Sequence, residues 1–152
     1  MIKKGKYKGK IQKNSSILIN NFHPAYKLPI SHKIVKESLS KVMDGEDCRF
    51  NEIIVNFVNN RMIRKLNSDH LKHDYFTDII TFPYNDKSNE IEGELFISLD
   101  TVKKNGKIYG TGYKPELIRV IIHGALHLTG YKDKTKSQKE LIRKKENFYL
   151  SC

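Results

Sequence analysis

The hydrophobic and polar positions of this chain follow two periods in turn. Runs that alternate apolar with polar residues, or that are rich in β-branched residues, predict strands at residues 16–22, 52–58, 77–84 and 93–100. Apolar residues three or four positions apart predict helices at residues 32–46, 59–71, 115–128 and 135–150. A shorter helix is expected from about Thr101. Ser31 is suited to cap the first helix, and Ile34 and Met62 are expected on the buried faces of the first two helices.

The order of these segments predicts the fold class. One strand and one helix alternate twice, and two strands and three helices follow. This order favours an α+β fold in which a mixed four-stranded sheet is packed with helices. The length of 152 residues fits a single domain with one core. We expect residues 1–15 to form a flexible basic tail and residues 16–152 to form the domain.

The composition, 38% hydrophobic and 30% charged, is typical of a globular protein in water. No apolar stretch reaches the roughly 18 to 20 residues that span a bilayer. The basic N-terminus has no apolar segment of about 7 to 15 residues behind it, which disfavours a secretory signal and makes a cytoplasmic location the expectation. Cys48 and Cys152 are far apart and neither belongs to a CxxC pair, so both are expected to be free thiols.

The charge of the chain adds a partner class. The formal net charge is +11 and the isoelectric point is about 9.6. No acidic residue precedes Glu37, and a second basic stretch, "KDKTKSQKELIRKK", occupies residues 132–145. A small basic domain attracts polyanions by releasing their condensed counterions, so nucleic acid is the favoured partner. The alternative is that these lysines only keep the protein soluble.

The apolar helix predicted at residues 115–128 is interrupted by His123 and His127. Residues four apart lie on one face of a helix, so both imidazoles can reach one ion. Gly130 is suited to end the helix, and Asp133 then returns toward the pair. The pattern His-x3-His-x2-Gly-x2-Asp has the spacing of a zincin-like zinc motif, with aspartate as its last ligand. A lone histidine on an apolar face is usually structural, but this constellation favours a metal site at the end of a core helix.

Three blocks of the chain resemble the YbeY family of bacterial metallo-endoribonucleases. "HGALHLTGYKD" is similar to the family's His-Gly-x-Leu-His-Leu-x-Gly-Tyr signature. "LNSDHLKHDYFTDIITFP" and "GELFIS" resemble two further family blocks in the same order, and together the blocks cover roughly residues 50 to 150. The resemblance implies a single-strand-specific, metal-dependent endoribonuclease that acts in rRNA maturation, at the 3′ end of small-subunit rRNA, and in ribosome quality control. It implies one Zn²⁺ per chain, ribosomal RNA as a partner, and contacts with small-subunit ribosomal proteins and assembly factors.

The family's residues carry over by position. His123 and His127 correspond to metal ligands, and Asp133 stands where the family usually has a third ligating histidine. A carboxylate is an acceptable zinc ligand, although it makes the site less positive by one charge. Leu71 stands where the family usually has an arginine that is thought to contact RNA, and Lys72 or Arg64 is the expected replacement. Lysine would offer a point charge without the bidentate fork of arginine.

The general base is not evident from the motif, because Gly124 occupies the position of the glutamate in zinc proteases. Asp78 is the first candidate, since it opens the predicted strand in a family-like block. Its alternative role is a hydrogen-bond acceptor at the start of that strand. Two rival functions remain at this level: a zinc metalloprotease, which the missing glutamate and the basic charge disfavour, and a non-catalytic, zinc-stabilised ribosome-assembly factor that binds rRNA.

Overall fold

A computed structural model describes residues 15–71, 77–85 and 90–152 of the chain. The predicted basic tail lies outside these residues, except Ser15, and so does Lys72. The elements in chain order are β1 (Ser16–Asn21), α2 (His32–Gly45), β2 (Arg49–Val58), α3 (Asn60–Leu71), β3 (Ile79–Pro83), β4 (Glu90–Ser98), α4 (Leu99–Tyr109), α5 (Tyr113–Leu128) and α6 (Lys136–Leu150). The predicted order of strands and helices is confirmed.

The four strands form one mixed sheet in the order β1-β2-β4-β3. β1 pairs parallel with β2, β2 pairs parallel with β4, and β3 pairs antiparallel with β4. β3 is therefore an edge strand, where the terminal Pro83 is tolerated because its missing N–H leaves no inner ladder bond unmade. Asp78, just before β3, accepts a backbone hydrogen bond from Ser98 at the end of β4.

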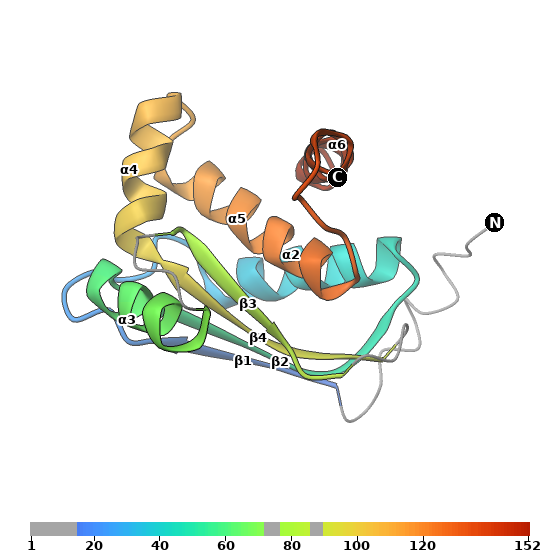
Figure 1. Ribbon diagram of the computed structural model, residues 1–152, viewed down its shortest axis with the longest axis horizontal. Coiled ribbons are helices and arrows are strands. Elements are labelled where there is room, and N and C mark those ends of the chain that lie inside the picture. Colours follow the sequence, from blue (N-terminus) through green and yellow to red (C-terminus); the bar gives the residue numbers. More distant parts are fainter. Residues whose placement is uncertain (1–14, 72–76, 86–89) are drawn as a thin grey trace.

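Helices cover the two faces of the sheet unequally (Figure 1). α2 and α5 pack on one face and share the main core with α4 and α6, while α6 lies outermost, against α5 and α2. α3 packs on the opposite face over a small second cluster around Val58, Ile63 and Ile80. Among the described residues, no helix combines the length and apolar character that crossing a membrane requires.

Local sequence signals explain where several helices begin. Ser31 caps α2 by accepting a hydrogen bond from the backbone N–H of Ile34, as predicted. Thr135 and Gln138 form a reciprocal capping box at the start of α6.

The expected burial of Ile34 and Met62 is wrong, because their exposures are 36% and 37%. Each residue lies at the border of its helix's apolar stripe, beside a neighbour that is fully buried.

Glycine at position 124 allows α5 to lie directly on the sheet. A Cβ atom there would be 2.6 Å from Ile79 Cδ1 and 3.0 and 3.1 Å from the two Cδ atoms of Leu95. Gly124 is buried, and it faces β3 and β4 rather than the cleft beside the histidines. The glutamate that a zinc protease carries at this position therefore has no room here.

We expect Gly124→Ala to lower the free energy of unfolding, because the added methyl overpacks the contact between α5 and the sheet. Overpacking of this kind costs about 1 to 3 kcal/mol, against which the better helix propensity of alanine returns up to about 1 kcal/mol. Urea denaturation measures the difference. Ile79→Val removes the nearest contacting atom, so the double variant should recover part of the loss; additive effects of the two substitutions would contradict this packing account.

Candidate metal centre

The end of α5 returns the chain toward its own last turn. Gly130 has φ +112°, in the left-handed region that favours glycine. The backbone N–H of Gly130 donates to the carbonyl of His127, and that of Tyr131 donates to the carbonyl of Leu126. These two bonds form a Schellman motif, which ends the helix and satisfies carbonyls that would otherwise lack partners. The turn brings Asp133 back to the two histidines.

The structure brings His123, His127 and Asp133 together. The Nε2 atoms of the two histidines are 3.0 Å apart, and each is 3.3 Å from Oδ2 of Asp133. Tetrahedral ligands about 2.0 to 2.1 Å from a metal are separated by about 3.3 to 3.4 Å. The three atoms therefore have nearly the dimensions of one face of a tetrahedral metal site. Among the described residues they are the one group of three or more such side chains with this geometry.

The other ring nitrogens determine which atoms face the centre of this triangle. His127 Nδ1 lies 2.9 Å from the carbonyl oxygen of Tyr131, which can only accept, so Nδ1 carries the proton. His123 Nδ1 lies 2.6 Å from Oε2 of Glu146. With both protons on Nδ1, two neutral rings direct Nε2 lone pairs at each other and at the carboxylate of Asp133. Three converging electron-pair donors repel one another unless a proton on one ring or a metal ion lies between them, and the donor set is one that fits a metal ion.

Glu146, on α6, is a second-sphere residue that sequence reasoning missed. Its side chain is 5% exposed, and its Oε1 accepts a hydrogen bond of 2.8 Å from a guanidinium N–H of Arg119, with which it forms an ion pair. Burial raises the pKa of Glu146, but hydrogen bonds from His123 and Arg119 outweigh it, and the net pKa is lowered. Burial likewise lowers the pKa of His123, whereas Glu146, Asp133 and Asp78 raise it more. A carboxylate behind a histidine fixes the ring and increases its basicity as a ligand.

A second missed residue, Glu46, lies at the C-terminal end of α2. Its carboxylate accepts hydrogen bonds from the hydroxyls of Tyr131 and Tyr149 and from Lys145. Burial raises the pKa of Glu46, but these three partners lower it below its ordinary value. The bond to Tyr131 matters for the centre, because the backbone carbonyl of the same residue orients His127.

Asp78 lies beside the triangle. It lines a cleft of about 270 Å³ together with His123, Asp133 and Glu146. Burial raises the pKa of Asp78 above its ordinary value, although the charge of His123 and local hydrogen bonds oppose the rise. The structure thus brings the predicted base and two of the predicted ligands into one cavity.

Neither residue that was predicted to contact RNA is found at the metal triangle among the described residues. Arg64 is exposed on α3, on the face of the sheet opposite α5. Lys72 lies outside the described residues, and the assignment of Arg64 and Lys72 to RNA stays a prediction.

Comparisons with known proteins identify the family of the chain. A family model described as Endoribonuclease YbeY matches residues 19–152. The chain belongs to this family.

Individual relatives show how far the likeness extends. Endoribonuclease YbeY of Chloroherpeton thalassium is 43% identical over 118 residues, which cover 78% of this chain and 83% of the relative. Endoribonuclease YbeY of Cytophaga hutchinsonii is 43% identical over 117 residues, which cover 77% and 82%. The solution structure of TM1509 from Thermotoga maritima matches with a TM-score of 0.61 and 26% identity, over 89% of this chain and 87% of that one. The triangle and its supporting residues all lie within the stretch that the family model matches.

We expect Glu146→Gln to weaken metal binding about 10- to 100-fold, because an amide orients the His123 ring less firmly and adds no negative charge behind it. Competition with a chromogenic chelator measures the affinity. Glu140→Gln is the matched control, since Glu140 lies on the exposed side of the same helix. Equal affinities of the two variants would show that Glu146 does not support the ligand.

Proposed function

We propose that this protein is a metal-dependent endoribonuclease that cleaves single-stranded RNA, with one Zn²⁺ held by His123, His127 and Asp133. The observation that carries the proposal is the convergence of three lone-pair donors in a cleft that also contains Asp78 and is bordered by basic side chains. The names of the relatives, Endoribonuclease YbeY, supply the reaction class. Two imidazoles and one carboxylate suit zinc, and they also accept iron, manganese or nickel, so the choice of zinc rests on the tetrahedral dimensions.

The residues of the cleft have separate roles in the proposed reaction. A divalent ion bound by three protein ligands supplies Lewis-acid activation of water and of a phosphoryl oxygen. Asp78 is the proposed general base, which takes the proton of the attacking water. Its raised pKa suits this role, because a base is most effective when its pKa approaches the working pH. Glu146 and the carbonyl of Tyr131 hold the two histidines in place.

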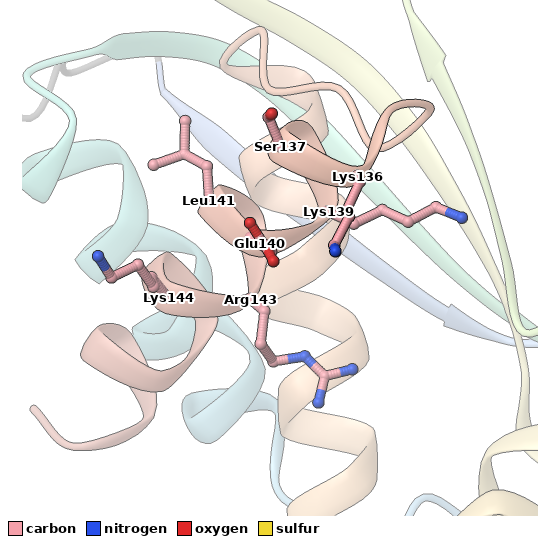
Figure 2. Close-up of a pocket in the computed structure, with 7 residues that line it drawn as sticks. All are labelled: Lys136, Ser137, Lys139, Glu140, Leu141, Arg143 and Lys144. Carbon is pink, nitrogen blue, oxygen red and sulfur yellow. The ribbon is translucent and has the colours of Figure 1, made fainter.

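A basic surface on α6 supports an RNA substrate. Figure 2 shows a shallow pocket on this helix, lined mainly by cationic side chains: Lys136, Lys139, Arg143 and Lys144. Lys139 and Arg143 also line the cleft that contains His123 and Asp133. A single-stranded RNA bound along these cations would therefore reach the metal triangle. We assign the phosphate contacts chiefly to Lys139 and Arg143, with Arg64 as a candidate for a more distant part of the RNA strand, and Lys72 stays a candidate without an assigned place.

The biological substrate we propose is ribosomal RNA, at the 3′ end of the small-subunit rRNA, in the cytoplasm. Ribosomal proteins of the small subunit and assembly factors are the corresponding proposed protein partners. The net charge of +11 fits association with a large RNA particle.

We expect His127→Ala to abolish both stoichiometric zinc and RNA cleavage, because it removes one vertex of the triangle. Asp133→Ala should retain less zinc than the wild type, since two imidazoles alone hold the ion weakly. Elemental analysis and cleavage of a labelled single-stranded RNA measure the two effects on samples of equal folded fraction. Stoichiometric zinc in Asp133→Ala would remove Asp133 from the ligand set. Equal cleavage by wild type and His127→Ala would refute the proposal, and RNA binding without any cleavage would favour an assembly factor.

We expect Asp78→Asn to lower the cleavage rate by about 100-fold or more while zinc is retained, because an amide cannot accept the proton. Single-turnover cleavage by zinc-loaded protein measures the rate. The shape of the side chain is conserved, so a change in unfolding temperature serves as the check on folding. An unchanged rate would leave Asp78 as a hydrogen-bond acceptor at the start of β3 and nothing more.

A further inference from the structure

The cleft extends well beyond the metal triangle. α5 contributes Glu116, Arg119, Val120 and His123 to its lining. Asn105 and Tyr109 of α4 and Arg143 of α6 also line it. Glu116 and His123 are seven positions apart, which corresponds to about 10.5 Å along the helix axis. Glu116 and His123 therefore mark two different places in one cavity.

Glu116 carries a carboxylate at this end of the cleft, and no described residue makes a hydrogen bond with its side chain. It is 5% exposed, yet it lines the cleft. Burial raises its pKa, and the charges of Asp78 and Glu146 add to the effect, while Arg119 and Arg143 oppose it. The carboxylate oxygens keep contact with the solvent in the cleft, where a bound ligand can replace that water. Its position in the first turn of α5 suits the helix dipole, but an exposed carboxylate would satisfy the dipole equally.

We propose that the end of the cleft at Glu116 is a subsite for a nucleobase, and that the base it takes is guanine. The proposal rests on the RNA substrate proposed above and adds a position at which the sequence of that RNA is recognised. A phosphodiester lies at the metal triangle, and the base of a neighbouring nucleotide enters the cleft toward α4. Tyr109, which is 65% exposed at the mouth of the cleft, provides a ring on which that base stacks.

Guanine follows from the hydrogen bonds that Glu116 lacks. A carboxylate has two oxygens and accepts two parallel bonds best from two adjacent N–H donors. Guanine is the RNA base whose Watson–Crick edge carries such a pair, the ring N1–H and the amino group at N2. Adenine and cytosine offer one amino donor next to an acceptor, and uracil offers one N–H between two carbonyls. The other bases would therefore leave one carboxylate oxygen facing an acceptor.

The test compares pentaribonucleotides of the form UUXUU, in which X is guanosine, inosine, adenosine, cytidine or uridine. Fluorescence anisotropy with the zinc-loaded protein measures the dissociation constants. We expect guanosine to bind more tightly than every other base by a factor between about 5 and 150, the discrimination typical of a bidentate contact. Inosine keeps N1–H and lacks the amino group, so it should lose most of this advantage.

Two variants locate the preference. Glu116→Gln should reduce the advantage of guanosine to within about twofold, whereas Glu37→Gln, a matched loss of one exposed carboxylate on α2, should leave it unchanged. Tyr109→Ala should weaken the binding of all five oligonucleotides by a similar factor, because stacking does not distinguish bases. Equal binding of guanosine and inosine by the wild type, or an undiminished preference in Glu116→Gln, would overturn the proposal. The inosine comparison needs no variant, so a misfolded Glu116→Gln would not leave the question open.

The outcome is independent of catalysis. Guanosine preference in a protein that cleaves no RNA would support the subsite and refute the nuclease. Cleavage of all five oligonucleotides with equal affinities would refute the subsite and leave the nuclease intact.

Discussion

The direct contact of α5 with the sheet sets the positions of the groups in the metal centre. Because Gly124 has no side chain, the helix comes close enough for Ile79 and Leu95 to fill the space that a Cβ would occupy. Ile79 directly follows Asp78, so the same contact that seats the helix also places the proposed base beside His123. A larger residue at position 124 would separate α5 from β3, and the two halves of the site would move apart.

The triangle itself depends on groups from distant parts of the chain. The Schellman turn at Gly130 returns Asp133 to the histidines and aims the carbonyl of Tyr131 at His127. Glu146 of α6 orients His123, and Glu46 at the end of α2 holds the ring of Tyr131. Both carboxylates have lowered pKa values, because hydrogen bonds to their charged forms outweigh burial. The metal centre thus ties α6, which lies outside the layer that packs on the sheet, to α5 and α2.

The parts of this arrangement that are local in sequence could be predicted, and the parts made by packing could not. His123, His127, Gly130 and Asp133 fall within one helix end, so their spacing alone indicates their proximity. The order of strands and helices follows from periodicity, since each element carries its own pattern. Ile34 shows the limit of that pattern, because periodicity does not say where an apolar stripe ends.

Glu146 lies between Ile142 and Tyr149 on the buried side of α6, and an acid within an apolar stripe was the signal available for it. Glu46 carries no such signal, since its partners, Tyr131 and Tyr149, are far away in sequence. Glu116 resembles an ordinary acid in the first turn of a helix, and only the walls built by α4 and α6 make it buried. These roles arise from contacts between residues that are far apart in the sequence. No fixed spacing along the chain indicates such contacts.

The outermost position of α6 has a thermodynamic consequence. This helix contributes Glu146 to the centre and cations to the cleft, yet it touches the rest of the molecule mainly through α5 and α2. A cation bound in the triangle strengthens the bond between His123 and Glu146, and so it favours the docked state of the helix. By linkage, docking increases the affinity for the cation by the same factor. The C-terminal helix α6 and the metal site therefore act as one cooperative unit, and removal of the cation by a chelator would weaken the docking of α6 first.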